Sequence, residues 1–266
     1  MAYTIIADSG ATKCEWTIIG GAKNKTIFTI GISPYFLSKS QIIELVSTQV
    51  AQKIKDKEVA NVFFYGTGLS NAENAAIVKK VLKTCFANAA IEVGTDLLAA
   101  ARALCGTKKG IACILGTGSN SGFYNGKKIV KNSPGIGYVL GDEGSGAYLG
   151  KKVVQYFLYE TFDAELTAQF TDKFKVSRAD ILNAVYKQPF PSRYLAGFAM
   201  FLAENRGHYM VENILEDGLN DFFFQHIYKY KESWSLPIHF VGSVAHGFKD
   251  VLKDLCTGYE LELGTV

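Results

Sequence analysis

The stretch that decides the fold is IACILGTGSNSGFYNGKKI, residues 111–129. An apolar run enters a short turn of glycine, threonine, serine and asparagine, and a second β-rich run follows at once. The stretch YTIIADSGATKCEWTIIGG, residues 3–21, has the same pattern, with Gly10 at the position that Gly118 has in the other. Both stretches predict a β-hairpin, and their recurrence predicts an architecture built from two matching halves.

The elements around the two hairpins follow one order in both halves. The first half predicts strands at 3–8, 14–19 and 26–30, a helix at 40–56, a strand at 61–68, a helix at 71–87, a strand at 90–96 and a helix at 97–106. The second predicts strands at 110–116, 121–126 and 135–141, a helix at 145–162, a helical stretch at 163–232, a strand at 237–243, a helix at 245–258 and a strand at 259–264. We therefore predict an α/β protein with an N-terminal lobe (1–107) and a C-terminal lobe (108–266) that carries a helical insertion at 163–232. The sequence has no counterpart of the first half's last helix, so either that helix is missing or the sequence stops short of it.

Composition narrows the classes of function. The chain has 28 basic and 25 acidic residues, well mixed, which argues against a nucleic-acid-binding surface. No run of about 20 apolar residues predicts a membrane span, and the N-terminus shows no signal peptide. The five cysteines have no metal-binding spacing and are read as reduced thiols of a cytoplasmic protein.

The two hairpin turns are candidates for phosphate binding. A glycine-bearing turn lets backbone N–H groups approach an anion closely, and Thr12, Thr117 and Ser119 add hydroxyl donors. Lys13 offers a positive charge, and Asp8, at the end of the first strand, could hold Mg²⁺ through water. Hairpins favour the same residue types for local reasons, so a single turn is weak support. Two such turns at equivalent places favour a site that holds the phosphates of one nucleotide across a cleft between the lobes.

Three further segments are candidates for a functional role, because each has a glycine or an acidic residue just before a predicted helix. Asp96 follows a strand and precedes a helix, so it is either a helix N-cap or a general base for phosphoryl transfer. Asp142 lies in the glycine-rich segment GYVLGDEGSGAYLG, residues 137–150, where it either caps a helix or binds sugar hydroxyls. Gly242 and Ser243 form either a tight strand–helix joint or the edge of a nucleotide site.

The motifs DSGATK, GTD, GTGSN, GIGYVLGDEGSG and VGSV occur in this order over nearly the whole chain. Together they resemble the N-acetylglucosamine kinase-like family and the related BadF/BadG-type ATPases, which include activators of 2-hydroxyglutaryl-CoA dehydratase. The resemblance implies the duplicated ribonuclease H-like fold of the actin-like ATPases, with two lobes and an interlobe cleft. Ile136 stands where the family often has tryptophan, and Ser33–Pro34 stands where many relatives have Asn-Pro.

The resemblance also implies roles for individual residues. Asp96 would be the catalytic base for the sugar 6-hydroxyl. The ATP-binding set would be Asp8, Gly10, Thr12, Lys13, Gly116, Thr117, Gly118, Ser119, Gly242 and Ser243. The sugar-binding set would be Asn120, Gly135, Ile136, Gly137 and Asp142.

The leading hypothesis is an ATP- and Mg²⁺-dependent kinase that phosphorylates the 6-hydroxyl of an amino or N-acetylated hexose, above all N-acetylglucosamine. One alternative is an ATPase that activates a partner enzyme, which requires cysteines for a shared [4Fe–4S] cluster. A second alternative is a non-catalytic sugar or nucleotide sensor on the same fold. We expect a small-molecule sugar as the partner, with neither nucleic acid nor membrane, and the sequence leaves a homodimer open.

Overall fold

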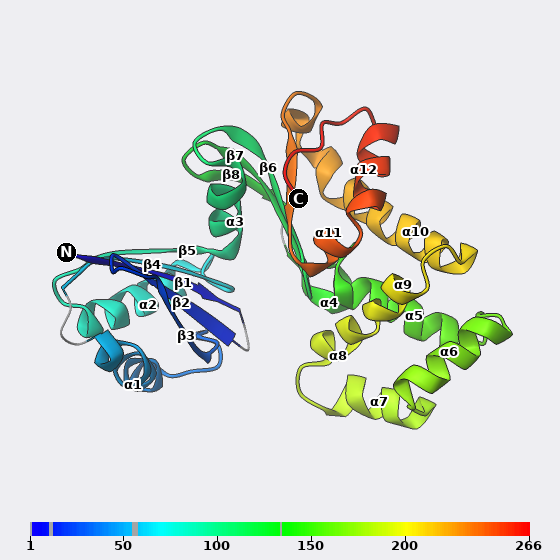
Figure 1. Cartoon of the computed structure of the whole chain (residues 1–266), viewed down its shortest axis with the longest axis horizontal. Helices are drawn as coiled ribbons and strands as arrows, with labels where there is room; N and C mark the ends of the chain where they lie inside the picture. Colours follow the sequence, from blue (N-terminus) through cyan, green and yellow to red (C-terminus); the bar gives the residue numbers. More distant parts are fainter. Residues whose placement is uncertain (1, 11–12, 55–57, 134) are drawn as a thin grey trace. The chain divides into compact units, whose positions relative to one another are not determined.

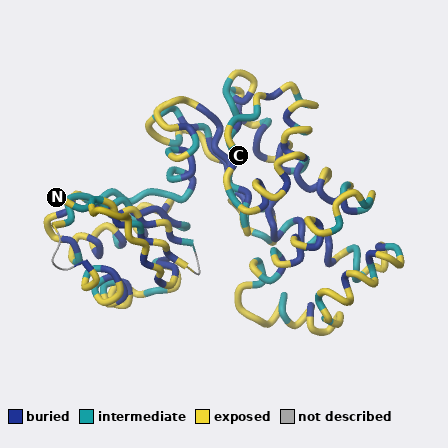
Figure 2. Tube along the Cα trace, in the orientation of Figure 1, coloured by how far each residue is buried: buried dark blue, intermediate teal, exposed yellow. Residues whose placement is uncertain are grey.

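The computed structural model describes residues 2–10, 13–54, 58–133 and 135–266. The chain forms two compact units, residues 1–99 and 100–266, each with its own hydrophobic core. Buried residues run along the strands and the inner faces of the helices within each unit (Figure 2). The predicted lobe boundary at 107/108 stays a prediction, and the observed division falls inside the helix α3 (Asp96–Cys105).

The first unit is a five-stranded sheet with two helices packed on one face (Figure 1). The strand order is β3-β2-β1-β4-β5, in which β1 is antiparallel to β2 and parallel to β4. The elements are β1 (Tyr3–Ser9), β2 (Lys13–Ile19), β3 (Lys25–Ile30), α1 (Lys39–Gln49), the 3₁₀ helix η1 (Ala51–Ile54), β4 (Val59–Gly66), α2 (Ala72–Cys85), β5 (Ala90–Thr95) and α3. The predicted order of strands and helices in this half is confirmed.

Local sequence explains where these elements lie. In β2, Cys14, Trp16 and Ile18 alternate with outward-facing residues, so one face of the strand is buried against α1 and α2. Helix α1 begins with a capping box formed by Ser38 and Gln41, because each side chain bonds the other's backbone N–H.

The second unit repeats the sheet and adds many helices. Its strand order is β8-β7-β6-β9, with β6 antiparallel to β7 and parallel to β9. The strands are β6 (Lys109–Leu115), β7 (Ser119–Asn125), β8 (Ile129–Ser133) and β9 (Ile238–Val241). The helices are α4 (Gly137–Leu140), α5 (Gly146–Leu158), α6 (Ala164–Phe174), α7 (Arg178–Lys187), α8 (Pro191–Gly197), α9 (Ala199–Glu204), α10 (Tyr209–Gln225), η2 (Ile227–Lys229), η3 (Lys231–Trp234), α11 (Ser243–Gly247) and α12 (Lys249–Gly258). Among the described residues, none of these helices is both long and apolar enough to cross a bilayer.

The predicted strand at 135–141 is wrong. Asn125 Oδ1 accepts hydrogen bonds from the N–H groups of Lys127 and Lys128, which turns the chain and makes 129–133 the partner of β7. Among the described residues, no strand pairs with 135–141. Gly137 takes a left-handed φ of 76°, and the Gly141 N–H donates to the Gly137 carbonyl at 2.8 Å, closing the short helix α4.

The predicted strand at 259–264 is also wrong as a full strand. Glu260 has a left-handed φ of 56°, which interrupts an extended backbone there. In the part of the chain that the structure describes, this segment forms a single isolated bridge, between Ile238 and Leu263. Three backbone hydrogen bonds of 2.8–2.9 Å nevertheless join residues 262–265 to β9, so this tail lies beside β9 as β5 lies beside β4. The predicted helix at 245–258 divides at Phe248 into α11 and α12.

Candidate functional site

The first predicted turn lies between β1 and β2. The Gly10 N–H donates to the Lys13 carbonyl at 3.0 Å, which closes the hairpin, while Thr12 lies outside the described residues. Ser9 fixes the end of β1, because its hydroxyl accepts from the Ile32 N–H at 2.8 Å. The Lys13 ammonium lies 3.8 Å from the centroid of the Phe28 ring, so the cation is held beside the turn by a cation–π contact.

Two carboxylates influence each other in this unit. Asp8 lies opposite Glu15 in the β1–β2 ladder, and burial together with the Glu15 charge raises the pKa of Asp8. Asp96 is half-buried; burial is the main cause that raises its pKa, and the Asp8 charge adds to it. A pKa raised toward neutrality is the property that a general base requires.

Asp96 occupies the first helical position of α3 and does not cap the helix alone. Its Oδ1 accepts from the Leu97 N–H at 2.7 Å, while the Thr95 hydroxyl accepts from the Leu98 N–H at 3.2 Å. Because Thr95 precedes the helix and bonds to its third N–H, it performs the usual N-cap function. The second Asp96 oxygen therefore has no capping duty.

The second turn, residues 116–119, connects β6 and β7 and is supported by α5. The Gly116 N–H donates to the Gly118 carbonyl at 3.0 Å, and the N–H groups of Gly146 and Ala147 donate to the carbonyls of Gly116 and Thr117 at 2.8 and 3.0 Å. The buried Ser119 hydroxyl has no hydrogen-bond partner in the part of the chain that the structure describes. Backbone hydrogen bonds from the start of α5 therefore fix the turn, while the Ser119 hydroxyl stays unpaired among the described residues.

Asp142 lies directly against this turn. A Cβ atom on Gly118 would come within 3.0 Å of Asp142 Oδ2, so the approach depends on glycine at that position. The Ser119 N–H donates to the Asp142 carboxylate and lowers its pKa, but burial outweighs this effect and the pKa is raised. The Asp142 backbone has a left-handed φ of 58°, a conformation in which aspartate is enriched.

Two of the remaining predicted residues of the second unit, Gly135 and Gly242, lie beside the same turn. Gly135 lies beside the Ser119 carbonyl, since a Cβ atom there would be 4.0 Å from that oxygen. Asn120 Oδ1 accepts from the Asn132 side chain at 2.8 Å, and Ile136 is exposed. Gly242 has a φ of 120° and packs on the Leu115 carbonyl, where a Cβ atom would be only 2.2 Å away. Ser243 is exposed at the start of α11.

The structure therefore gathers the predicted residues into two sets. Asp8, Gly10, Lys13 and Asp96 belong to the first unit. The turn at 116–119 lies with Gly135, Asp142 and Gly242 in the second. That both sets hold one nucleotide and one sugar stays a prediction.

Sequence reasoning missed a buried polar group beside the second set. His226 contacts Glu143 at 3.1 Å and Ser121 at 3.4 Å. The three residues are far apart in the sequence, and no local motif joins them. The one sequence feature that could have pointed to this group is Glu143, an acidic residue directly after Asp142.

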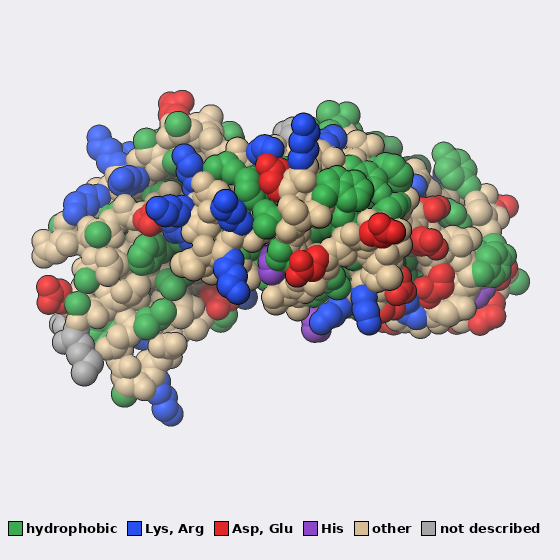
Figure 3. Space-filling model, turned by 90° about the horizontal axis from the view of Figure 1, so that it is seen from above, with side chains coloured by type: hydrophobic (Ala, Val, Ile, Leu, Met, Phe, Trp, Pro, Cys, Tyr) green, Lys and Arg blue, Asp and Glu red, His purple; other side chains and the backbone are tan. Residues whose placement is uncertain are grey.

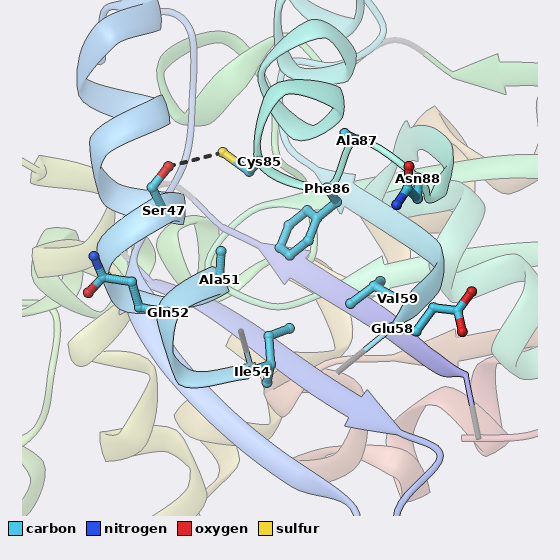
Figure 4. A pocket seen from close by; sticks show the side chains of 10 residues that line it. All are labelled: Ser47, Ala51, Gln52, Ile54, Glu58, Val59, Cys85, Phe86, Ala87 and Asn88. Atoms are coloured by element: carbon cyan, nitrogen blue, oxygen red, sulfur yellow. Dashed lines mark hydrogen bonds between the residues drawn. The ribbon is translucent and has the colours of Figure 1, made fainter. Parts of the chain in front are cut away.

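Other surface features do not coincide with the predicted site. A pocket of about 450 Å³ in the first unit is lined by Ser47, Cys85, Phe86 and neighbouring residues, and it contains no predicted ligand-binding residue (Figure 4). On the face drawn in Figure 3, basic and acidic side chains are scattered among neutral ones.

A solved structure from Porphyromonas gingivalis, provisionally assigned as an N-acetylglucosamine kinase, is 37% identical to this chain. It covers 100% of this chain and 94% of its own length, with a TM-score of 0.91. The chain belongs to the N-acetylglucosamine kinase-like family. The match over the whole chain confirms the predicted fold class, the actin-like ATPase fold with two mixed α/β sheets.

Two more distant proteins are also similar to this chain. The N-acetylmuramic acid/N-acetylglucosamine kinase of Clostridium acetobutylicum is 24% identical over 239 residues, covering 84% of this chain and 78% of that protein. A structure from Chromobacterium violaceum, with a similar provisional assignment, shares the fold at 17% identity and a TM-score of 0.75, over 100% of this chain and 94% of its own. No protein-family model matches the chain.

Proposed function

We propose that the protein is an ATP-dependent sugar kinase that phosphorylates the 6-hydroxyl of an N-acetylated or amino hexose, most directly N-acetylglucosamine. Family membership supports a sugar kinase, and the names of the relatives support the N-acetylhexosamine. The observation that carries the proposal is the half-buried Asp96, whose pKa is raised and whose capping duty is shared with Thr95.

Asp96 acts as the general base. The sugar 6-oxygen attacks the γ-phosphorus of ATP, the bond from that phosphorus to the β–γ bridging oxygen breaks, and Asp96 takes the hydroxyl proton. The products are ADP and the sugar 6-phosphate. Such transfer depends mainly on positioning and electrostatics, with the base adding about 10²–10⁴-fold.

In this proposal the two turns hold the phosphates, and Asp8 would hold Mg²⁺ through water. The donor set fits: two neighbouring carboxylates of raised pKa offer oxygen ligands, and a divalent cation would relieve their repulsion. Among the described residues, no group of three acidic, histidine or cysteine side chains could hold a metal alone. Mg²⁺ would thus bind through Asp8 and the phosphates, where it neutralises developing charge.

The sugar occupies the surroundings of Asp142. Asn120, Gly135, Ile136, Gly137 and Asp142 lie on three segments that meet beside the second turn. One Asp142 oxygen is close to the turn, and the carboxylate as a whole can still accept from sugar hydroxyls. Gly242 and Ser243 belong to the proposed ATP-binding residues.

The activator alternative receives little support from the cysteines. Cys113 and Cys256, the cysteines in the second predicted lobe, are 0% and 1% exposed, so neither thiol reaches the surface to share a cluster.

The test is ADP release from ATP with N-acetylglucosamine, glucosamine and glucose, with the product's phosphorylated position read by phosphorus NMR. We expect N-acetylglucosamine to be the best substrate, and Asp96→Asn to lower kcat by about 10²–10⁴-fold. Glu73→Gln, in the first turn of α2 in the same unit, is the matched control. Absence of turnover with every sugar, or full activity of Asp96→Asn, would contradict the proposal. Tight sugar binding without turnover would identify a sensor instead.

A further inference from the structure

A chain of buried polar contacts, which we call the Tyr230 network, runs behind the second turn. It consists of Glu143, His226, Ser121, Tyr230 and Ser133. His226 Nε2 lies 3.1 Å from Glu143 Oε2, and His226 Nδ1 lies 3.4 Å from Ser121 Oγ. The Tyr230 hydroxyl lies 2.9 Å from Ser121 Oγ, donates to the Ser121 carbonyl at 2.9 Å and accepts from the Ser133 N–H at 2.6 Å.

Each end of the network adjoins a segment of the proposed site. Ser121 is two residues beyond Ser119, Ser133 is two residues before Gly135, and Glu143 follows Asp142. We propose that Tyr230 and His226 are positioning residues, which set the relative placement of the second phosphate turn, the sugar-lining segment and Asp142. The proposal rests on the proposed function, because it assigns a purpose to an arrangement within that site.

Tyr230 lies where β7 and β8 separate. Ser121 and Ser133 form the last pair of their ladder, beyond which one strand leads to the turn at 116–119 and the other to Gly135. At this pair the Tyr230 hydroxyl bonds to the backbone of both residues. Because the angle between the diverging segments depends on this pair, one hydroxyl group controls the spacing of two ligand-binding segments.

His226 holds the loop that carries Asp142. The imidazole is 4% exposed and stacks on Phe222, with ring centroids 4.6 Å apart. A Cβ atom on Gly144 would come within 2.9 Å of Phe222 Cβ, so this loop packs closely on the last turn of α10. Contact with Glu143 on one side and Ser121 on the other joins the loop to β7.

The network is buried and its polar groups are mutually satisfied. Ser121 is 0% exposed and Tyr230 is 2% exposed, so water cannot replace a lost partner easily. Buried networks of this kind specify one arrangement of the segments they join, and partial loss leaves unpaired groups. Small displacements of positioning groups are expensive in catalysis, since about 1 Å costs roughly 10²-fold.

The experiment compares Tyr230→Phe with Tyr228→Phe. Tyr228 lies in η2, which Tyr230 directly follows. It is not part of the network, and its hydroxyl hydrogen-bonds to Tyr259. We expect Tyr230→Phe to lower kcat/KM for N-acetylglucosamine by roughly 10–100-fold. It should also accelerate hydrogen exchange in both 116–122 and 133–144. Tyr228→Phe should change neither quantity.

The exchange measurement separates this proposal from the proposed function. If the wild-type protein turns over no sugar, the proposed function fails, while exchange in the two segments still tests the positioning role. Equal exchange and equal kcat/KM in the two variants would overturn it. If Tyr230→Phe does not fold, His226→Gln and His226→Ala replace it. Glutamine keeps a donor for Glu143 and should recover part of the activity and protection that alanine loses; identical loss in both would count against the network.

Discussion

The two sheets place a glycine-bearing hairpin turn at equivalent positions, yet each turn is fixed in a different way. In the first unit the turn is closed by one Gly10–Lys13 bond, and the nearby side chains are the mutually repelling carboxylates of Asp8 and Asp96. In the second, the N-terminus of α5, Asp142 and the close approach of Gly242 all support the turn. The first turn therefore lies near two carboxylates that repel each other, whereas the second turn is held by backbone hydrogen bonds and close packing.

This contrast suggests a division of tasks in the proposed reaction. Carboxylates with raised pKa values suit proton transfer and cation binding, and they cost stability wherever they are charged. Backbone bonds and close packing suit precise placement of a ligand. The following predictions test whether the first unit holds the reactive groups and the second the positioning groups.

The largest effect is expected from Gly242→Ala, compared with Gly66→Ala. Gly66 is the last residue of β4, which is parallel to β1, and Gly242 directly follows β9, which is parallel to β6. A Cβ atom at Gly242 would lie 2.2 Å from the Leu115 carbonyl oxygen at a φ of 120°, whereas at Gly66 it would lie 3.1 Å from the Ser9 oxygen. Urea denaturation should show a loss of roughly 2–5 kcal/mol for Gly242→Ala and about 1 kcal/mol for Gly66→Ala. Equal losses of unfolding free energy in the two variants would contradict the difference in packing between the two units.

A smaller effect is expected from alanine in the two turns. In Gly118→Ala the new methyl group would press on Asp142 Oδ2 at 3.0 Å and displace the carboxylate, so KM for the sugar should rise about tenfold. In Gly10→Ala the nearest atom among the described residues is the Lys13 carbonyl oxygen at 3.7 Å, an ordinary contact, so the expected effect of the methyl group is on an approaching phosphate. KM for ATP should therefore rise more than KM for the sugar. Steady-state kinetics with each substrate varied checks both, and the reverse order would contradict the assignment of the turns.

The dependence of stability on pH should have opposite signs for groups of the two units. Burial lowers the pKa of His226 from 6.5, so its contribution is complete above that value and is lost as the pH falls toward the lowered pKa. Burial raises the pKa of Asp96 from 3.8, so its contribution is present below that value and is lost as the pH rises through the raised pKa. At neutral pH Asp96→Asn should therefore melt above the wild type. Thermal melts from pH 4 to 8 check this, with His246→Gln and Glu73→Gln as controls.

The smallest effect concerns the contact between Lys13 and Phe28. A double-mutant cycle with Lys13→Met and Phe28→Leu should give a coupling of about 0.5–1 kcal/mol, as expected for an exposed cation–π pair. ATP should reduce this coupling, because the ammonium group turns to a phosphate. Coupling that is unchanged by ATP would indicate that Lys13 does not take part in nucleotide binding.

Much of the fold could be predicted, because apolar alternation, turn residues and helix caps act over a few neighbouring positions. Asn71 caps α2, and Gly106 ends α3 with a left-handed φ of 60°. The prediction of a strand at 135–141 was wrong for a physical reason, because an apolar run becomes a strand only when a partner strand is available. The turn at 125–128 had already given that partner position to residues 129–133.

The sequence by itself determined the two hairpins and the order of strands and helices in the first half, and it supplied the residues that we propose for binding phosphate and sugar and for accepting the proton. Tertiary structure alone decided that Asp142 rests on Gly118 and that Asp8 affects the pKa of Asp96. It also decided that Tyr230 joins Ser121 to Ser133. The reason is that turns and caps depend on bonds between near neighbours. Burial, electrostatic coupling and side-chain networks depend instead on which distant segments the packed core brings together.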